Sequence, residues 1–236
     1  MVVSRESQSN ILSLLNVLRH GDSFFPSGAV AFSYGLESLS SDGSVNSFEH
    51  IEEFIHSQLY GRWAGLDRAC LVSAHTACLD QVDIKRLIEI DHIMDAATLP
   101  SLLREGSLRA GAAILGVHTK LKTPGVTEYR EYILSGNALG HLAVSQGACF
   151  SGSGLSVVET EVISAHTLVV GLASAAIRLG IIGHIESQSL ISLMGTEIEK
   201  IISLPAPEIE EAWCFSPVSD IAVMKHEVSE GRLFSN

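Results

Sequence analysis

Apolar residues recur at helical spacing along most of the chain. The pattern is clearest between residues 51 and 70, where successive apolar side chains lie three or four positions apart: Ile51, Ile55, Leu59, Trp63, Leu66 and Cys70. This spacing places them on one face of a helix. Asn46 and Glu49 have the spacing of a capping box and predict where that helix begins.

The same period predicts further helices over residues 83–96, 100–121, 127–149, 158–179 and 186–202. Pro100 suits the first turn of its helix, and Gly180 suits the position just after a helix end. No sustained alternation of apolar and polar residues is bounded by hairpin turns. The sequence therefore predicts an all-α fold of roughly eight to ten helices, forming a single domain over residues 1–236 with a flexible start at residues 1–9.

Two of the predicted helices have interiors rich in small residues. They are Gly106, Ala110, Gly111, Ala112 and Ala113 in one helix, and Gly171, Ala173, Ser174, Ala175 and Ala176 in the other. Glycine inside a helix costs about 1 kcal/mol relative to alanine, and this cost is tolerated where two backbones pack closely. The partner backbone belongs either to the same chain or to a second copy in a dimer.

Charge and hydropathy narrow the class of protein. Lys and Arg total 15 against 27 Asp and Glu, so the net charge of −12 argues against binding to nucleic acid or to an anionic membrane. The mean hydropathy of +0.29 makes a membrane span worth checking. The most apolar run, residues 162–182, contains His166 and Arg178, which favours a buried helix of a soluble protein.

Known catalytic and cofactor motifs do not occur. The sequence contains no GxxxxGK[ST], GxSxG or HExxH pattern, and the spacing of Cys70, His75 and Cys78 does not suit a shared metal ion. The four cysteines form no CxxC pair and the first ten residues lack a secretory signal, so we expect a cytoplasmic protein with reduced thiols.

Both ends of the chain carry unusual segments. Residues 21–37 hold three phenylalanines and a tyrosine among turn-forming residues, which either fill the core or form an apolar contact surface. The last residues place Arg232 beside Leu233 and Phe234. Arginine and aromatic side chains dominate the hot spots of protein interfaces, so this end is a candidate anchor for a partner.

Five blocks of residues, in order and spread over nearly the whole chain, resemble the UreF family of urease accessory proteins. The blocks are Asp22-Ser23 with Pro26, Gly28, Ser33 and Gly35-Leu36-Glu37; Arg104-Glu105-Gly106-Ser107-Leu108-Arg109 with Gly111; Gly140-His141 with Val144 and Gly147; Arg178-Leu179-Gly180 with Gly183 and Gln188; and Pro217, Asp220-Ile221, Met224 and His226-Glu227 followed by Arg232-Leu233-Phe234. Five blocks in one order are far more specific than any single block.

The resemblance implies an all-helical, non-enzymatic chaperone of nickel insertion into urease. Such a protein forms a homodimer, joins the accessory protein UreD (UreH in some organisms) and recruits the GTPase UreG, and the assembly acts on apo-urease. Nickel and GTP then belong to the partners, and no cofactor is expected in this chain. The candidates for contact with UreD lie in a tail over residues 220–236: Asp220, His226, Glu227, Arg232, Leu233 and Phe234.

Two other hypotheses stay open at this point. One is a small helical hydrolase or lyase that uses His141, or His226 with Glu227, as acid and base; it requires a concave pocket with perturbed titrating groups. The scaffold hypothesis instead requires a broad, partly apolar exposed surface. The other is a family member that no longer serves urease, which neighbouring urease genes would distinguish.

Overall fold

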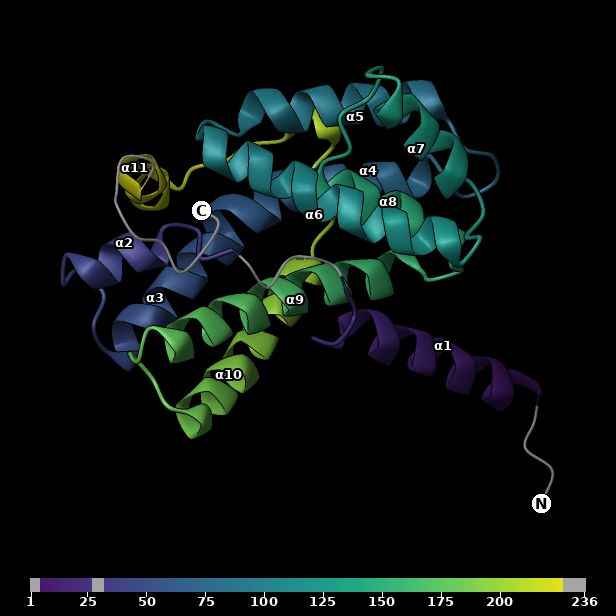
Figure 1. Ribbon diagram of the computed structural model, residues 1–236. Coiled ribbons are helices and arrows are strands. Elements are labelled where there is room, and N and C mark those ends of the chain that lie inside the picture. Colours follow the sequence, from purple (N-terminus) through teal and green to yellow (C-terminus); the bar gives the residue numbers. More distant parts are fainter. Residues whose placement is uncertain (1–4, 27–31, 227–236) are drawn as a thin grey trace.

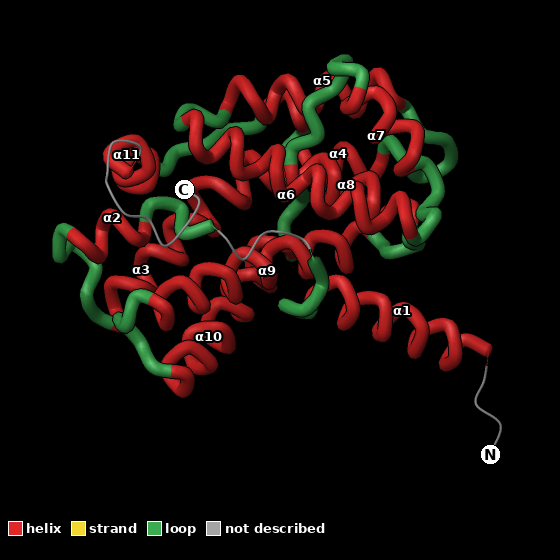
Figure 2. Tube along the Cα trace, viewed as in Figure 1, coloured by secondary structure: helices red, strands yellow, loops and turns green. Residues whose placement is uncertain are grey.

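The computed structural model describes residues 5–26 and 32–226, and within these ranges every regular element is a helix (Figures 1 and 2). In chain order they are α1 (Arg5–Gly21), α2 (Leu36–Ser41), α3 (Phe48–Gln58), a π-helix (Leu59–Asp67), α4 (Arg68–Thr76), α5 (Ile84–Ala97), α6 (Ser101–Lys120), α7 (Val126–Leu134), α8 (Leu142–Gly152), α9 (Val157–Arg178), α10 (His184–Ile202), a 3₁₀ turn (Ile209–Glu211) and α11 (Pro217–His226). The predicted all-α class is confirmed. α3, the π-helix and α4 follow one another without a break and form one long helix. Counted in this way, the α-helices in the described part of the chain number ten, which is the upper end of the expected range.

Most helix boundaries agree with the sequence pattern, and two do not. α3 is capped by Ser47, whose Oγ accepts a hydrogen bond from the backbone N–H of His50 at 3.3 Å. The prediction of a cap at Asn46 is therefore wrong. Ser47 stands one residue closer to the helix, at the position from which a short side chain reaches the third helical N–H.

The single helix expected over residues 127–149 is also wrong, because the segment forms α7 and α8 with a loop between them. Gly136 and Gly140 in that loop have φ angles of +77° and +83°. This left-handed conformation ends a right-handed helix and favours glycine. Gly180, predicted to follow the end of α9, has a φ of +73° and confirms that prediction.

The long helix α3–π–α4 passes through two hydrophobic clusters. Its first half packs with α2, α9 and α10, whereas its second half packs with α5, α6, α7 and α8. The six side chains of the predicted face are each at most 1% exposed, and the face spans both clusters: Ile51, Ile55, Leu59, Trp63, Leu66 and Cys70. One shared helix thus ties the clusters together, and the boundary of a single domain at residues 1–236 stays a prediction.

The small residues of α6 and α8 allow close packing inside the chain. A Cβ at Gly111 would lie 1.9 Å from the carbonyl oxygen of Gly140, and one at Gly147 would lie 2.5 Å from that of Leu71 on α4. In α9, Ala173, Ala175 and Ala176 are buried in the second cluster. The buried members of the two sets therefore follow the within-chain interpretation, whereas Ala112 of the first set is exposed.

α9 is the helix that is long and apolar enough to cross a membrane among the residues described. However, 56% of its most apolar window is buried inside the protein. The helix packs against α10, α4 and α8, and its buried positions belong to the core clusters. Burial therefore identifies α9 as a core helix, in agreement with the interpretation of the apolar run.

The aromatic residues of segment 21–37 divide between core and surface. Phe25 packs against the rings of His20 and His118, with centroids 5.1 Å and 5.7 Å away, and Phe32 is 6% exposed. Phe24 is 93% exposed. The core-filling interpretation thus holds for two of the phenylalanines and fails for the third, while Gly28 and its neighbours at 27–31 lie outside the described residues.

Candidate protein-interaction site

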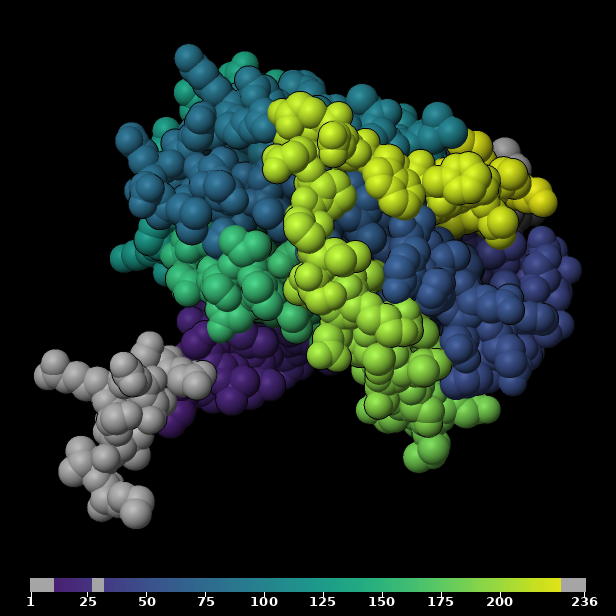
Figure 3. Space-filling view, turned by 180° about the vertical axis from the view of Figure 1, so that it is seen from behind, coloured from purple at the N-terminus to yellow at the C-terminus, as the bar shows by residue number. Residues whose placement is uncertain are grey.

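The last described part of the chain forms an arm across the outside of the molecule. After α10 the chain passes over the helices of residues 50–75, coloured blue, and ends in the yellow α11 (Figure 3). We call residues 213–226 the C-terminal arm. Two backbone hydrogen bonds hold its start: the N–H of Trp213 donates to the carbonyl of Gly65 at 3.2 Å, and the N–H of Phe215 donates to that of Gly61 at 2.7 Å.

Both acceptors lie in the π-helix, which is a rare element and often occurs at functional sites. A Cβ at Gly61 would lie 2.5 Å from the carbonyl oxygen of Phe215, and one at Gly65 would lie 2.5 Å from that of Trp213. Since real Cβ atoms do not approach oxygen so closely, only glycine lets the arm touch the helix backbone here. The π-helix is thus the seat of the arm.

The inner face of α11 is fixed on the turn before α2. Ala222 and Val223 are 2% and 0% exposed, and the Oγ of Ser219 donates a hydrogen bond to the carbonyl of Tyr34 at 2.6 Å. Gly35 has a φ of +86°, and a Cβ there would lie 2.8 Å from the Cβ of Ala222. Two family-like sequence blocks, the one that contains Gly35 and the one that begins at Pro217, therefore meet in space.

The arm exposes large apolar side chains, and the indole ring of one of them, Trp213, also lies against Gly65. Their exposed fractions are 48% for Trp213, 74% for Phe215, 63% for Val218, 55% for Ile221 and 40% for Met224. The last three recur at intervals of three residues, so they share one side of α11. Clustered exposed apolar residues with aromatic members are typical of protein-interaction surfaces. We call these five residues the arm patch.

The charged groups beneath the arm are largely buried. Arg62 is 4% exposed; its Nε lies 3.4 Å from the carboxylate of Asp67, and its Nη2 donates to Thr98 Oγ1 at 3.3 Å. Burial raises the pKa of Asp67, although the nearby charge of Arg62 acts in the opposite direction. Burial also raises the pKa of Asp220 on α11, again against the effect of Arg62.

A buried arginine on α4 fixes the path that leads to the arm. The Nε of Arg68 donates to the carboxylate of Glu161 at 2.6 Å, and its other nitrogens donate to the carbonyls of Ile201 at 3.1 Å and Leu204 at 2.6 Å. Both side chains of the ion pair are at most 5% exposed. Arg68 therefore holds the end of α10 and the start of the connection in one place.

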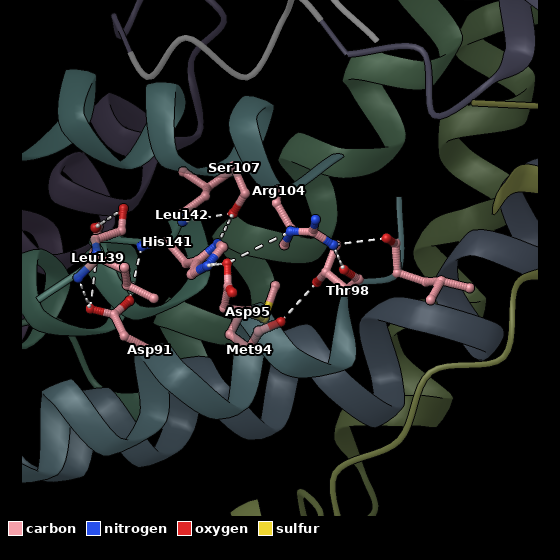
Figure 4. A network of polar contacts seen from close by, with 12 residues as sticks. Asp91, Met94, Asp95, Thr98, Arg104, Ser107, Leu139, His141 and Leu142 are labelled. Carbon is pink, nitrogen blue, oxygen red and sulfur yellow. Dashed lines mark hydrogen bonds and ion pairs between the residues drawn. The ribbon is translucent and has the colours of Figure 1, made fainter. Parts of the chain in front are cut away.

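A second polar network holds the loop between α7 and α8 (Figure 4). The carboxylate of Asp91 accepts hydrogen bonds from the backbone N–H groups of Leu139 at 3.2 Å, Gly140 at 2.9 Å and His141 at 2.9 Å. The hydroxyl of Tyr129 donates a fourth bond at 2.5 Å. Asp91 is fully buried and so acts as a clamp on this loop.

His141 sits in the same network with both ring nitrogens engaged. Its Nδ1 lies 3.1 Å from Ser107 Oγ, which also accepts from the backbone N–H of Leu142, and its Nε2 lies 3.2 Å from Asp95 Oδ1. Burial lowers the pKa of His141, against the neighbouring carboxylates Asp91 and Asp95. The ring is 0% exposed, so it holds structure together and offers no nitrogen to a substrate.

A pocket opens next to Arg62, between α6, α8, α9 and the π-helix. Its empty volume, the open mouth included, is about 700 Å³, and Trp63, Gln146 and Leu168 are among its lining residues. His141 does not line it. The Nε of Arg62 and one oxygen of Asp67 have no hydrogen-bond partner, but both atoms are buried from solvent. The pocket therefore does not bring His141 to a substrate.

Metal ligands do not gather in the part of the chain that the structure describes, where no three His, Cys, Asp or Glu side chains lie in a metal-binding arrangement. Burial raises the pKa of all four cysteine thiols, including that of Cys78, which rises to about 11. Reactive cysteines need a lowered pKa. These thiols are therefore packing groups.

The predicted partner residues fall at and beyond the end of the arm. Asp220 is partly buried on α11, and His226 ends that helix. Glu227, Arg232, Leu233 and Phe234 lie outside the described residues. Their contact with a partner stays a prediction.

The arm patch begins before the predicted tail, at Trp213, Phe215 and Val218. A sequence signal was present, because the run Trp213 to Phe215 and the Val218–Ile221 spacing follow Pro205 and Pro207, where the last long helix has ended. The sequence alone does not show that Ala222 and Val223 lie on the buried side of α11.

Comparison with known proteins agrees with the family resemblance. A family model for UreF matches residues 45–194. The urease accessory protein UreF of Trichodesmium erythraeum (strain IMS101) is 31% identical over 235 residues, which cover 97% of this chain and 99% of that protein. UreF of Yersinia enterocolitica is 26% identical over 230 residues, covering 96% of this chain and all of its own, and UreF of Yersinia pseudotuberculosis has the same identity and coverage. The chain therefore belongs to the UreF family of urease accessory proteins.

Proposed function

We propose that this member of a non-catalytic accessory family is a scaffold for assembly of the urease nickel centre. In the cytoplasm it joins UreD (UreH) through its C-terminal end, forms a homodimer, recruits the GTPase UreG and presents the assembly to apo-urease. The observation that supports this proposal best is the arm patch, a cluster of exposed apolar side chains on a firmly seated segment.

The arm patch suits a stable protein partner. Its two aromatic residues, Trp213 and Phe215, supply large apolar area at a low entropy cost, and interface hot spots favour such side chains. In the sequence, the patch is followed by Arg232, Leu233 and Phe234. We assign UreD to this whole surface, with the patch as the fixed part of the site.

Nickel and GTP are assigned to the partner proteins. The sequence holds no P-loop, whose backbone amides and lysine would grip the phosphates of a nucleotide. UreG supplies GTP hydrolysis in this proposal, and its docking surface on this chain is left unassigned.

Co-purification tests the proposal. The full chain, expressed with UreD, UreG and apo-urease of its own organism, is expected to elute with UreD and UreG and to raise urease activity in the presence of nickel. Retention of UreD and UreG without any gain of urease activity would favour a family member that no longer serves urease. Failure to retain UreD would contradict the scaffold proposal.

A further inference from the structure

Arg62 lies at the point where the C-terminal arm meets the body of the molecule. Its chain neighbour Gly61 accepts the hydrogen bond from the backbone N–H of Phe215 at 2.7 Å. The guanidinium of Arg62 lies 6.0 Å from the centre of the Tyr34 ring, and the carbonyl of Tyr34 accepts the hydrogen bond from Ser219 on α11 at 2.6 Å. One attachment near the start of the arm and one on α11 are therefore next to Arg62.

Asp220 lies on the side of α11 that faces the body. Ser216, four residues before it, and Val223, three residues after it, are 7% and 0% exposed. Residues at this spacing share one side of a helix, so Asp220 belongs to the buried side. Burial raises the pKa of Asp220 and the positive charge of Arg62 lowers it. The two charges therefore interact across the seat of the arm.

The end of the Arg62 side chain is also fixed relative to α5 and α6. Its Nη2 donates a hydrogen bond to Thr98 Oγ1 at 3.3 Å, and that hydroxyl donates to the carbonyl of Met94 at 2.9 Å. The carbonyl of Thr98 accepts a bond from Nη1 of Arg104 at 2.7 Å (Figure 4). Arg62 thus connects a rigid corner of the body to the arm.

Core stability does not account for this buried charge. The Nε of Arg62 lies 3.4 Å from one carboxylate oxygen of Asp67 without a hydrogen bond, and the other oxygen of Asp67 has no partner either. Replacing such a buried ion pair by apolar residues is often neutral or stabilising, because desolvation offsets the attraction. Burial lowers the pKa of Arg62, but neighbouring charges, Asp67 first and Asp220 among them, raise it above its ordinary value. The guanidinium therefore stays charged and can act on the arm.

We propose that Arg62, paired with Asp67, is the positioning residue of the C-terminal arm. Its charge attracts Asp220 and keeps the inner side of α11 on the body, which orients the arm patch for UreD. The inference rests on the proposed function, because it concerns how the surface assigned to UreD keeps its orientation.

Exchange of backbone N–H groups with deuterium tests the proposal on the protein alone. The variant Arg62→Met/Asp67→Leu leaves no unpaired buried charge, so its Tm is expected to stay close to that of the wild type. The N–H groups of Trp213 and Phe215 are expected to exchange at least about ten times faster, since they open with the arm, while those of α9 and α10 keep their protection. Wild-type exchange of the arm in the folded double variant would overturn the proposal.

Two single variants keep the test decisive if the double variant does not fold. Asp220→Asn is expected to speed exchange of the same arm N–H groups. Arg62→Lys keeps the positive charge but loses the bond to Thr98, so its exchange is expected to lie between those of the wild type and Asp220→Asn. Glu211→Gln removes one negative charge at an exposed position just before the arm and is the matched control, with exchange unchanged. Equal exchange in Asp220→Asn and Glu211→Gln would refute the role of the charge.

Binding of UreD separates positioning from direct contact. Asp220→Asn is expected to raise the Kd for UreD about threefold to tenfold in the otherwise wild-type chain. It is expected to have no further effect in the Arg62→Met/Asp67→Leu background, because both changes break the same interaction. An equal loss of affinity in the two backgrounds would mean that Asp220 contacts UreD directly, which contradicts the proposal.

The outcomes also separate this inference from the proposed function. Wild-type exchange of the arm in the folded Arg62→Met/Asp67→Leu variant refutes the role of Arg62 and leaves the scaffold function standing. Fast exchange of the arm in that variant, together with a wild type that does not retain UreD, supports the role of Arg62 in holding the arm and contradicts the proposed partner.

Discussion

Asp91 shows how one buried side chain can hold a loop that the hydrophobic pattern does not specify. Three backbone N–H groups and the hydroxyl of Tyr129 all point at its carboxylate. An amide in the same place would turn its NH₂ group toward some of these donors. The clamp therefore depends on the charge and on the four acceptor positions of a carboxylate.

We expect Asp91→Asn to lower the free energy of unfolding by about 3–5 kcal/mol, because charge-assisted bonds are lost and buried donors are left without a partner. Urea unfolding followed by circular dichroism measures the change. Asp80→Asn, at an exposed position, is the control and is expected to stay within about 0.5 kcal/mol. A loss below about 1 kcal/mol for Asp91→Asn would show that the clamp is unimportant.

His118 is expected to make stability fall in acid. Burial, with smaller effects from His20 and Arg19, lowers the pKa of His118 to about 4 in the folded protein. Its ordinary value is about 6.5, so the unfolded chain binds more protons between these two pH values. The stabilising contribution of neutral His118 is thus complete above pH 6.5 and is lost as the pH falls toward 4.

The variant His118→Gln does not titrate and is expected to show a shallower fall of unfolding free energy between pH 6.5 and pH 4.5. The difference in slope has an upper limit of about 1.4 kcal/mol per pH unit, the value for one proton. Thermal unfolding at several pH values measures it. Equal slopes for the two proteins would mean that His118 titrates normally when folded.

At the scale of elements, the glycines of the π-helix determine where the C-terminal arm lies. Gly61 and Gly65 accept the arm on their carbonyl oxygens, and each leaves the space that a side chain would fill. The arm patch keeps its orientation only while this contact persists.

We expect Gly61→Ala to displace the arm and weaken binding to UreD about tenfold or more, the size of effect typical of lost hot-spot contacts. A pull-down with UreD measures binding, and circular dichroism checks the fold. Gly116→Ala on α6 is the matched control, because no neighbouring atom would lie within 4 Å of the added Cβ. Its stability should stay equal or rise by up to about 1 kcal/mol. Undiminished binding by Gly61→Ala would contradict this role of the π-helix.

The helices show which elements can be predicted from sequence. The apolar period located the helix through Ile51 and Cys70 because burial on one face imposes that spacing. It did not reveal the π-helix, since residues 59–67 keep nearly the same spacing of apolar side chains. The apolar period also continues through the loop at Gly136 and Gly140, so it predicted a helix there. In this loop, backbone conformation and the Asp91 clamp decide the structure, rather than hydrophobicity.

At the scale of the whole molecule, the candidate site could be predicted only in part. The local pattern of Arg232, Leu233 and Phe234 pointed to the C-terminal end. Trp213 and Phe215 were not singled out, because aromatic residues usually enter a core, and only the tertiary fold shows that these two remain exposed.

Removing residues 232–236 is expected to leave Tm unchanged and to weaken the UreD pull-down more than about tenfold, since an anchor of this kind contributes at least about 2 kcal/mol. A terminal segment adds little to a core built from central helices. A large fall in Tm with binding intact would instead mean that Phe234 fills the protein's own core.

In the proposed scaffold, the exposed face of the C-terminal arm binds UreD. The most direct measurement compares the UreD affinity of the wild type with that of Val218→Ser/Ile221→Ser, whose two side chains are 63% and 55% exposed and do not support the fold. We expect a Kd at least about ten times higher for the double variant, consistent with loss of two apolar anchors, with Tm unchanged. An unchanged Kd in a folded double variant would contradict binding of UreD by this face of the arm.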